Sequence, residues 1–539
     1  MDDVRREPPR CLAGWPAYLF SHVLFPGPST AGGRPRLPGV LLLVALPALL
    51  LYPWLGFRLL EPDEGRYAQV PREMLERGDW VVPTLQGEPY LDKPPLVYWL
   101  VILSYRAFGA HDWAARLVPA LAVHATILLT YLLGSRTLGE RSARWGALLL
   151  AVAPVFVGMA RLLLLDGVLT LCVTVAVFAA FEAVRGDRLR WGWWLTAATA
   201  CGLGLLTKGP VAEVLLIVPL WLYRRLTGRG AAAGLAGWLA FLGVALAIAL
   251  PWYITLSLRQ PSFVSYFFWE HNLGRFFAPG IHVRGVWFYL PVVVLLLLPG
   301  TLLLVPLARF LGTADARLAR ERSPELGFHL LAGGWCVLFF TLSSCKLPTY
   351  ILPAAPFLAL ALGHFLARGP WRASRLPAWG CAASAAFVLL LHALALPWYA
   401  GYRSPMSRPE RVLALCADRS LPVVCFPRNC DSVAFYLRRS DLKAYRSKEI
   451  EELRYLVRTQ PRTVILCTHR HSLAGLKQLL PPEVRIAREE RLSLADDRKV
   501  PAWLRKPLAR LLGETALGLS DVTVIEMPPL VRDEVARSD

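Results

Sequence analysis

Long runs of apolar residues constrain this chain more than any other feature. Several runs approach the roughly 20 residues that a helix needs to cross a hydrocarbon core of about 30 Å. They are continuous rather than alternating, which favours helices and excludes a transmembrane β-barrel. Because 55% of the 539 residues are hydrophobic and the mean hydropathy is +0.43, we predict a polytopic α-helical membrane protein.

The apolar runs predict about 11–13 transmembrane helices. Eleven of these are assigned to residues 38–57, 113–134, 145–161, 163–184, 191–206, 209–226, 233–256, 287–308, 326–343, 348–367 and 376–398.

Arginine distribution predicts the orientation of these helices, because short connections rich in Arg and Lys stay in the cytoplasm. Arginines gather in the connections 135–144, 185–190, 224–230, 308–322 and 367–375. The N-terminus is then cytoplasmic, and the remaining connections lie on the outer face. This count requires that the short aromatic stretch from Leu96 to Ala107 does not cross, so we expect an interfacial helix there.

The formal charge of +20 has two interpretations. In a soluble protein it would suggest binding to nucleic acid. In this chain the arginines of the cytoplasmic connections explain the excess, and we expect no nucleic-acid partner. A basic cavity for anionic phospholipid substrates is a second use of the same charge.

Three regions follow from these patterns. Residues 1–36, rich in Arg and Pro, are predicted to be a cytoplasmic tail, and residues 37–400 form the transmembrane module with external loops at 58–112 and 257–286. Residues 401–539 are mixed in charge and contain no span. Apolar strands at 421–426, 463–468 and 521–527 alternate with two amphipathic helices at 447–459 and 471–480, which predicts a small external α/β domain.

Ten cysteines are scattered through the chain without the spacing of a zinc site. In the predicted external domain, Cys425 and Cys430 are close enough in sequence to form a disulfide. Two separate buried thiols are an equally good interpretation.

The segment from Glu61 to Trp99 is the first polar stretch, and it follows the first span directly. A carboxylate at the edge of a membrane is costly unless it has a partner or a function. We therefore interpret Asp63 as a catalytic acid, with Glu64 beside it. The same segment contains Asp92 and Lys93, and the other external connections add Asp166, Lys208, His271, Arg275, Lys346 and Tyr350.

Carboxylates combined with Lys and Arg suit a substrate that carries phosphate. Cations bind phosphate oxygens, and a carboxylate orients or deprotonates an acceptor. The sequence has neither a P-loop nor a Gly-rich loop that opens a helix after a strand, so a nucleotide donor has no visible site. A lipid-linked donor that arrives from the bilayer fits better.

The motifs resemble a known family. The string D-E-G-R-Y-A-x-x-P-R-E-M-L-x-x-G-D-W, followed by G-x-x-Y-x-x-K-P-P-L-x-Y-W, is similar to the aminoarabinose transferases that modify lipid A. R-L-x-x-x-D, L-x-K-G-P, F-F-W-E-H-N-L-x-R-F and S-x-K-L-P-T-Y-I-L-P-A-x-P follow in the family's order. More broadly, residues 38–370 resemble the protein mannosyltransferase-like GT-C glycosyltransferases.

The resemblance implies a GT-C fold with helices on the outer face and a periplasmic C-terminal domain. It implies that Asp63 and Asp166 are the essential acids of the first and second loops, and that Lys93 binds a substrate phosphate. Asp92 stands where the family commonly has Glu, which with the His at position 271 can hold a divalent metal. Asp92 is a shorter ligand, which puts that metal in doubt.

Each site residue also has a structural interpretation. Asp63 fits an N-cap, as does Asp166 at the head of its span. Glu64 fits a partner for Arg66 or Arg72, and His271 a simple hydrogen-bond partner. The lysines fit side chains that snorkel to the membrane surface, and the aromatic residues 266–269 fit an interfacial belt.

We therefore expect an inverting glycosyltransferase in a bacterial inner membrane. It would move a sugar from a polyprenyl (undecaprenyl) phosphate to lipid A or another envelope acceptor on the periplasmic face. Lys93, helped by Arg275 and Lys346, would hold the donor phosphate, while Asp63 and Asp166 would position sugar and acceptor. Alternative hypotheses are O-mannosyltransferase-like transfer to protein or another glycan, a polyprenyl-lipid flippase, and a silent relative that only binds glycolipids.

Overall fold

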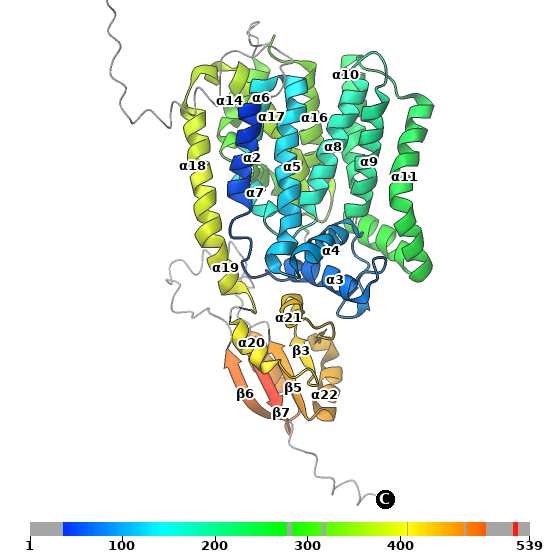
Figure 1. Ribbon diagram of the computed structural model, residues 1–539, viewed down its shortest axis with the longest axis vertical. Coiled ribbons are helices and arrows are strands. Elements are labelled where there is room, and N and C mark those ends of the chain that lie inside the picture. The colour runs from blue at the N-terminus through cyan, green and yellow to red at the C-terminus, as the bar shows by residue number, and fades with distance from the viewer. Residues whose placement is uncertain are drawn as a thin grey trace, which may run out of the picture.

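The computed structural model describes residues 36–277, 283–313, 315, 318, 320–406, 408–467, 470–491 and 521–526. Within these residues, a bundle of long helices carries a small sheet with its own helices at one end (Figure 1). We call the bundle end that faces this sheet the near end, and the opposite end the far end. The predicted tail, residues 1–36, lies outside the described residues except for Arg36.

Six helical segments are long and apolar enough to cross a membrane. They are α5 (Asp112–Leu138), α8 (Asp166–Val184), α11 (Gly234–Arg259), α16 (Pro324–Leu342), η6 with α17 (Pro348–Arg368), and α18 with the helical segments η8 and α19 that follow it (Leu376–Gly401). Two further pairs of helices are long and apolar enough only when each pair is taken together, and each pair is bent at a short break. They are α6 (Glu140–Ala151) with α7 (Pro154–Ala160), and Val286–Leu296 with Gly300–Gly312. A helix satisfies its own backbone in lipid, which is why these apolar runs take this form.

The three other predicted spans are also helical, but they are shorter or less apolar. They are α2 (Leu37–Leu51), α9 (Trp191–Lys208) and α10 (Val211–Thr227). By length and composition, the described residues therefore contain six spans, or up to eight if each bent pair is one span. This is fewer than the eleven to thirteen predicted, and crossing by these three helices stays a prediction.

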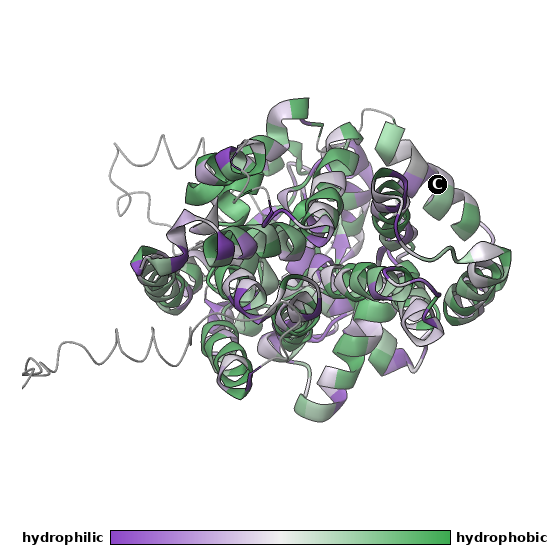
Figure 2. Cartoon of the chain, turned by 90° about the horizontal axis from the view of Figure 1, so that it is seen from above, coloured by the Kyte–Doolittle hydropathy of each residue, from purple (hydrophilic) through white to green (hydrophobic). Residues whose placement is uncertain are grey.

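Packing divides the helices into an inner and an outer set. The apolar windows of α8 and of η6 with α17 are 89% buried, whereas those of α11 and α18 are 33% and 17% buried. Seen from above, hydrophobic residues dominate the outer helices (Figure 2). The outer helices expose large apolar side chains such as Leu235, Leu258 and Leu390, as expected for a surface in contact with lipid.

Two short helices cover the near end of the bundle (Figure 1). They are α3 (Asp63–Arg77) and α4 (Leu96–Phe108), and the small hairpin of β1 (Thr84–Leu85) and β2 (Glu88–Pro89) lies between them in sequence. At 13 residues, α4 is too short to cross a membrane on its own. This agrees with the prediction that Leu96 to Ala107 does not cross.

The basic connections meet at the far end. Arg185 Nη1 donates to the carbonyl of Arg136 over 2.8 Å, and Arg141 Nη2 donates to the carbonyl of Arg372. Three predicted cytoplasmic connections, 135–144, 185–190 and 367–375, are therefore neighbours in space. One fully buried carboxylate, Glu182, compensates part of this charge through ion pairs of 3.1–3.4 Å with Arg136, Arg185 and Arg190.

The C-terminal domain is built on a mixed five-stranded sheet of order β4-β3-β5-β7-β6. β3 pairs in parallel with β4 and β5, while β7 pairs antiparallel with β5 and β6. The strands are β3 (Val423–Phe426), β4 (Lys443–Ala444), β5 (Arg462–Cys467), β6 (Arg485–Arg491) and β7 (Asp521–Glu526). The helices are α20 (Pro409–Leu415), α21 (Asp431–Leu437), η9 (Ser447–Glu449), α22 (Ile450–Thr459) and α23 (Arg470–Leu479).

This sheet includes all three strands that the apolar runs predicted, and the two predicted helices are present as η9 with α22 and as α23. Cys425 lies in β3 and Cys430 precedes α21, and both are buried thiols rather than a disulfide. Of the two interpretations of these cysteines, the structure therefore supports separate thiols.

Candidate active site

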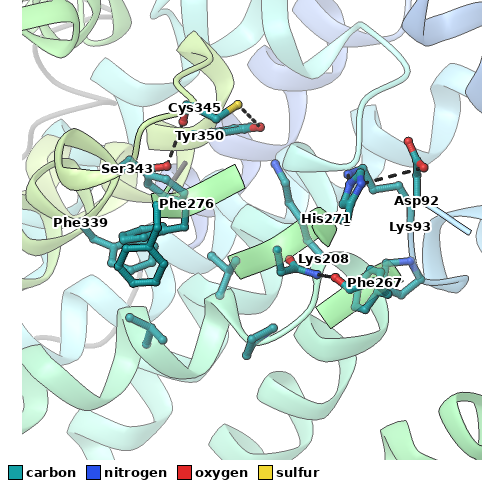
Figure 3. Close-up of a pocket in the computed structure, with 17 residues that line it drawn as sticks. Asp92, Lys93, Lys208, Phe267, His271, Phe276, Phe339, Ser343, Cys345 and Tyr350 are labelled. Atoms are coloured by element: carbon teal, nitrogen blue, oxygen red, sulfur yellow. Dashed lines mark hydrogen bonds and ion pairs between the residues drawn. The ribbon is translucent and has the colours of Figure 1, made fainter. Parts of the chain in front are cut away.

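A cavity of about 310 Å³ opens among α9, α10, α16 and the external connections. Five of the predicted site residues line it: Asp92, Lys93, Lys208, His271 and Tyr350. The rest of its wall is mostly aromatic or aliphatic and includes Phe267, Phe276, Phe339, Phe340 and Val214. Figure 3 shows Phe276 and Phe339 on the opposite side of the cavity from Asp92, Lys93 and His271. Charged side chains therefore gather on one side of the cavity, where Phe267 also lies, and Phe276 and Phe339 lie on the opposite side.

Lys93, His271 and Asp92 form one charged group in the cavity wall. Lys93 Nζ lies 2.7 Å from Nε2 of His271, and Nδ1 of His271 lies 3.9 Å from Oδ1 of Asp92. Tyr90 and Tyr266 donate hydrogen bonds to the two oxygens of Asp92, the first over 3.2 Å. His271 belongs to η3 (Ser265–Gly274), a π-helical segment, and such segments are frequent at functional sites.

These contacts decide how well Asp92 and His271 suit the divalent metal that the family can hold. The ammonium of Lys93 faces Nε2 of His271, and the two tyrosine hydroxyls occupy both oxygens of Asp92. The described residues contain no group of three or more His, Cys, Asp and Glu side chains able to hold a metal ion. The donor set does not fit a metal in this arrangement, and the chemistry below uses none.

Asp166 and Lys208 form the second charged group. Asp166 is the first residue of α8 and is buried, and Lys208 is the last residue of α9. Lys208 Nζ donates to Oδ1 of Asp166 over 2.6 Å and lies 4.1 Å from the centre of the Tyr350 ring. The ion pair and the ring hold the ammonium at the cavity wall, where it is available to a phosphate oxygen.

Asp63 stands apart from the cavity lining. It is the first residue of α3, the cap position belongs to Pro62, and half of its side chain is exposed. Its carboxylate lies 3.9 Å from Nη1 of Arg66, whose guanidinium lies 5.7 Å from the centre of the Tyr90 ring. Burial raises the pKa of Tyr67 well above its usual value, and the charges of Asp63 and Asp166 add to this effect. Tyr67 therefore lies within electrostatic reach of both predicted acids.

Glu64 has the contacts of a structural residue. It is buried, and its oxygens accept two bonds from Arg116, of 2.7 and 2.8 Å. The amides of Leu60 and Leu163 also donate to it, over 3.0 and 2.8 Å. The expected partners Arg66 and Arg72 were wrong. Arg66, two residues further on, points about 200° around the helix from Glu64, and Arg72 pairs instead with Glu76 over 2.6 Å.

Lys346 does not line the cavity. Lys346 is buried, and its ammonium donates to the carbonyl of Arg284 over 3.1 Å and to that of Ser343. Arg275 begins α12 (Arg275–Phe277), but its side chain lies outside the described residues. Phosphate contact by these two residues stays a prediction.

Sequence reasoning assigned no role to Tyr90 or to the hydroxyl of Tyr266. Tyr90 is the tyrosine of the G-x-x-Y-x-x-K-P-P string, three residues before Lys93, and this spacing was the available signal. Tyr266 was grouped with the aromatic belt, yet its hydroxyl bonds Asp92. Trp269, by contrast, is largely exposed, as expected for a belt residue.

The C-terminal domain docks on α3 beside Asp63. The carbonyl of Arg439 accepts bonds from Gln69 (2.7 Å) and Arg72 (2.6 Å), and Glu61 accepts a bond of 2.6 Å from the amide of Ser432. Asp431, buried at the start of α21, lies 3.9 Å from Nε of Arg66. Arg66 therefore lies between Asp63 and an acid of the C-terminal domain.

This docking predicts that the stability of the protein depends on pH, and that Glu61→Gln reduces this dependence. Burial and the charge of Asp431 raise the pKa of Glu61 from 4.5 to about 8. Folded protein then retains a proton that the unfolded chain releases above pH 4.5, so stability falls as pH rises from 4.5 to about 8, by at most about 1.4 kcal/mol per pH unit. We expect the thermal midpoint of the purified protein to fall over this range, and the Glu61→Gln midpoint to fall less.

The matched control for this experiment is Glu88→Gln, because Glu88 is an exposed carboxylate in β2. It should follow the wild-type pH curve. Parallel curves for wild type and Glu61→Gln would contradict the assignment of the titration to Glu61.

Known proteins with similar sequences come from the families that the motifs resemble. The family model for dolichyl-phosphate-mannose-protein mannosyltransferase matches residues 39–267. An undecaprenyl phosphate-α-4-amino-4-deoxy-L-arabinose arabinosyl transferase of Pseudomonas fluorescens is 36% identical over 350 residues, 63% of this chain and 58% of the relative. A Pseudomonas aeruginosa transferase of the same name is 35% identical over 340 residues, 60% of this chain and 59% of the relative. The chain thus matches less than two thirds of the length of these relatives.

The fold extends beyond the matched sequence. The crystal structure of ArnT from Cupriavidus metallidurans bound to undecaprenyl phosphate superposes with a TM-score of 0.70 and 21% identity, covering 90% of this chain and 97% of ArnT. The apo structure of the same protein gives the same values. The chain is therefore a multi-pass membrane protein with the GT-C architecture of ArnT and a C-terminal domain, and its sequence resembles the aminoarabinose transferases and, over residues 39–267, the protein mannosyltransferases.

Proposed function

We propose that this chain is a membrane glycosyltransferase that moves a sugar from a polyprenyl (undecaprenyl) phosphate carrier to lipid A or another envelope acceptor. The observation that carries the proposal is the cavity in which Lys93 and Lys208 line the same space as Phe276, Phe339 and Phe340. A phosphate suits the lysines, and an isoprenoid chain suits the aromatic side. The names of the similar transferases, and undecaprenyl phosphate in the ArnT structure, support the same substrate class.

The reaction breaks the bond between the sugar anomeric carbon and the carrier phosphate, and it forms a bond from that carbon to the acceptor oxygen. Lys93 and Lys208 stabilise the negative charge that develops on the departing polyprenyl phosphate. Asp63 takes the proton when the acceptor is a hydroxyl. When the acceptor is an ionised phosphate, no base is needed, and Asp63 orients the acceptor.

The proposed location is a bacterial inner membrane, with the near end of the bundle on the periplasmic side. The grouping of Arg-rich connections at the far end supports this orientation, because such connections stay in the cytoplasm. Residues 37–400 then form the catalytic module, and residues 401–539 form a periplasmic domain that docks on α3 beside Asp63.

Reconstitution of the full chain in proteoliposomes tests the proposal. With undecaprenyl-phosphate sugar as donor and lipid A as acceptor, mass spectrometry should detect the glycosylated product. A matched reaction with acceptor protein identifies transfer of the O-mannosyltransferase type, to which the matching family model points. Movement of the donor across the bilayer without transfer to any acceptor would replace the enzyme with a flippase.

Lys208→Met should weaken use of the lipid-phosphate donor. The substitution removes the ammonium that Asp166 and Tyr350 hold at the cavity wall. A charge-assisted hydrogen bond contributes about 1.5–3 kcal/mol, so we expect KM for the donor to rise roughly 10- to 100-fold. Steady-state kinetics over a donor series measures the change.

Two companion variants make this result specific. Lys208→Arg retains the charge and should retain part of the affinity. Lys477→Met removes a surface lysine paired with Glu489 in the C-terminal domain and should leave KM unchanged. An unchanged KM in Lys208→Met would remove this lysine from the donor site.

A further inference from the structure

A second polar cavity lies at the far end of the bundle, away from the candidate active site. Its volume is about 90 Å³, and its wall includes Arg141, Ser142, Arg368, Arg372 and Glu321. Ser142 is in the first turn of α6, Arg368 ends α17, and Arg372 is in the short helix η7 (Pro370–Ala373). Three arginines from separate elements thus converge on one small space.

The charge of this cavity is poorly compensated among the described residues. Glu321 is its single acidic lining residue, and it lies 3.6 Å from Arg368 with about a third of its side chain exposed. Nε of Arg141 is buried and has no hydrogen-bond partner in the described part of the chain. Burying an N–H donor without a partner costs about 1–3 kcal/mol. An anion in the cavity would relieve both deficits.

The neighbouring arginine cluster shows that poorly compensated positive charge is not a general property of the far end. Arg136, Arg185 and Arg190 surround the fully buried Glu182 at 3.1–3.4 Å. That cluster surrounds one fully buried carboxylate, whereas the part-exposed Glu321 at the cavity pairs with Arg368 alone among the three arginines that line it. Retention of a loop in the cytoplasm requires positive charge, but it does not require arginines gathered around a cavity.

The donors at the cavity match phosphate chemistry. Guanidinium groups bind phosphate oxygens through two parallel hydrogen bonds, and the N-terminus of α6 adds the positive end of a helix dipole. A cavity of about 90 Å³ has room for a phosphate group. We infer that the Arg141–Arg368–Arg372 cavity binds a phosphate group, either the headgroup of an anionic phospholipid or a free phosphate.

Ligand titration of the full chain in neutral detergent tests this inference. The probes are phosphatidylglycerol, the diacylglycerol with the same acyl chains, and inorganic phosphate, and the readouts are native mass spectrometry and the thermal midpoint. Arg141→Gln/Arg368→Gln is compared with wild type. We expect at least tenfold weaker binding of the phosphate-bearing probe in the double variant, and no difference for diacylglycerol.

The probes distinguish the two sources of phosphate. Binding of phosphatidylglycerol without binding of inorganic phosphate identifies a lipid headgroup, and saturable binding of inorganic phosphate identifies a free anion. Arg372→Gln changes an exposed side chain and gives a second test if the double variant does not fold. Arg188→Gln removes an exposed arginine of another far-end connection and serves as the control. Equal binding of both phosphate probes by wild type and by the cavity variants would overturn the inference.

Discussion

Asp63→Asn is expected to reduce sugar transfer to a hydroxyl acceptor by about 10²- to 10⁴-fold, the usual contribution of a general base. The carboxylate is at the start of α3, where the helix dipole favours its negative charge. Half of the side chain is exposed, so an acceptor can reach it. The amide of Asn keeps the size of the side chain but accepts no proton at neutral pH.

The structure also separates catalysis from a capping role for Asp63. Pro62 occupies the cap position of α3, so the substitution removes no cap. The nearest cation, Arg66, lies 3.9 Å away in a partly exposed pair, and such pairs contribute little to stability. Asp63→Asn should therefore unfold at the wild-type temperature while its rate falls.

Single-turnover transfer in proteoliposomes is the decisive measurement for Asp63. The control is Asp187→Asn, the same chemical change at an exposed position in the connection 185–190, which should leave the rate unchanged. If the transfer rate of Asp63→Asn with a phosphate acceptor falls by less than tenfold at every pH, the role of Asp63 is positioning rather than proton transfer. Wild-type rates with both acceptor classes would remove Asp63 from the mechanism.

The near-end residues were largely predictable because charge at a membrane edge is costly and therefore informative. Lys93, Lys208 and Asp166 each occur where an apolar run begins or ends. The two lysines line the cavity, and Asp166 accepts a hydrogen bond from Lys208. Which of these charged side chains pair with one another was not predictable. Lys208 and Asp166 are separated by 42 residues, and only the packing of α8 on α9 brings them together.

The separate roles of Asp63 and Glu64 also required the structure. Neighbouring residues in a helix point about 100° apart, so two adjacent acids can lie on different faces. α3 has ten buried residues out of 15 and includes the buried polar side chains of Gln69, Arg72 and Glu73. Because its buried face contains charged groups, hydrophobic periodicity could not indicate which acid lies inside.

Removing the carboxylate of Glu64 is expected to be the most destabilising single change at the near end. Arg116 is fully buried, and its guanidinium also donates to the carbonyls of Leu55 (2.8 Å), Phe57 and Arg58 (3.1 Å). Glu64 in turn accepts the amide of Leu163, three residues before Asp166. Breaking a buried ion pair by removing one partner costs about 3–5 kcal/mol, so Glu64→Ala should lower the unfolding midpoint sharply.

Three comparisons identify the ion pair as the cause. Arg116→Lys should also lower stability although it retains the positive charge, because a lysine cannot make the two parallel bonds to Glu64. Glu64→Leu/Arg116→Met should be more stable than Glu64→Ala, since it leaves no buried charge without a partner. Glu483→Gln breaks a half-exposed pair with Arg458 and should cost about 1 kcal/mol or less.

A further variant, Glu64→Gln, tests whether Glu64 takes part in chemistry. If its role is to hold α3 against α5 and the turn before α8, the transfer rate per folded Glu64→Gln molecule should stay within about tenfold of wild type, because other groups supply the general base. The folded fraction is measured by size-exclusion chromatography of the purified protein, and the rate by single-turnover transfer on that fraction. A rate loss as large as that of Asp63→Asn in fully folded protein would make Glu64 a catalytic residue after all.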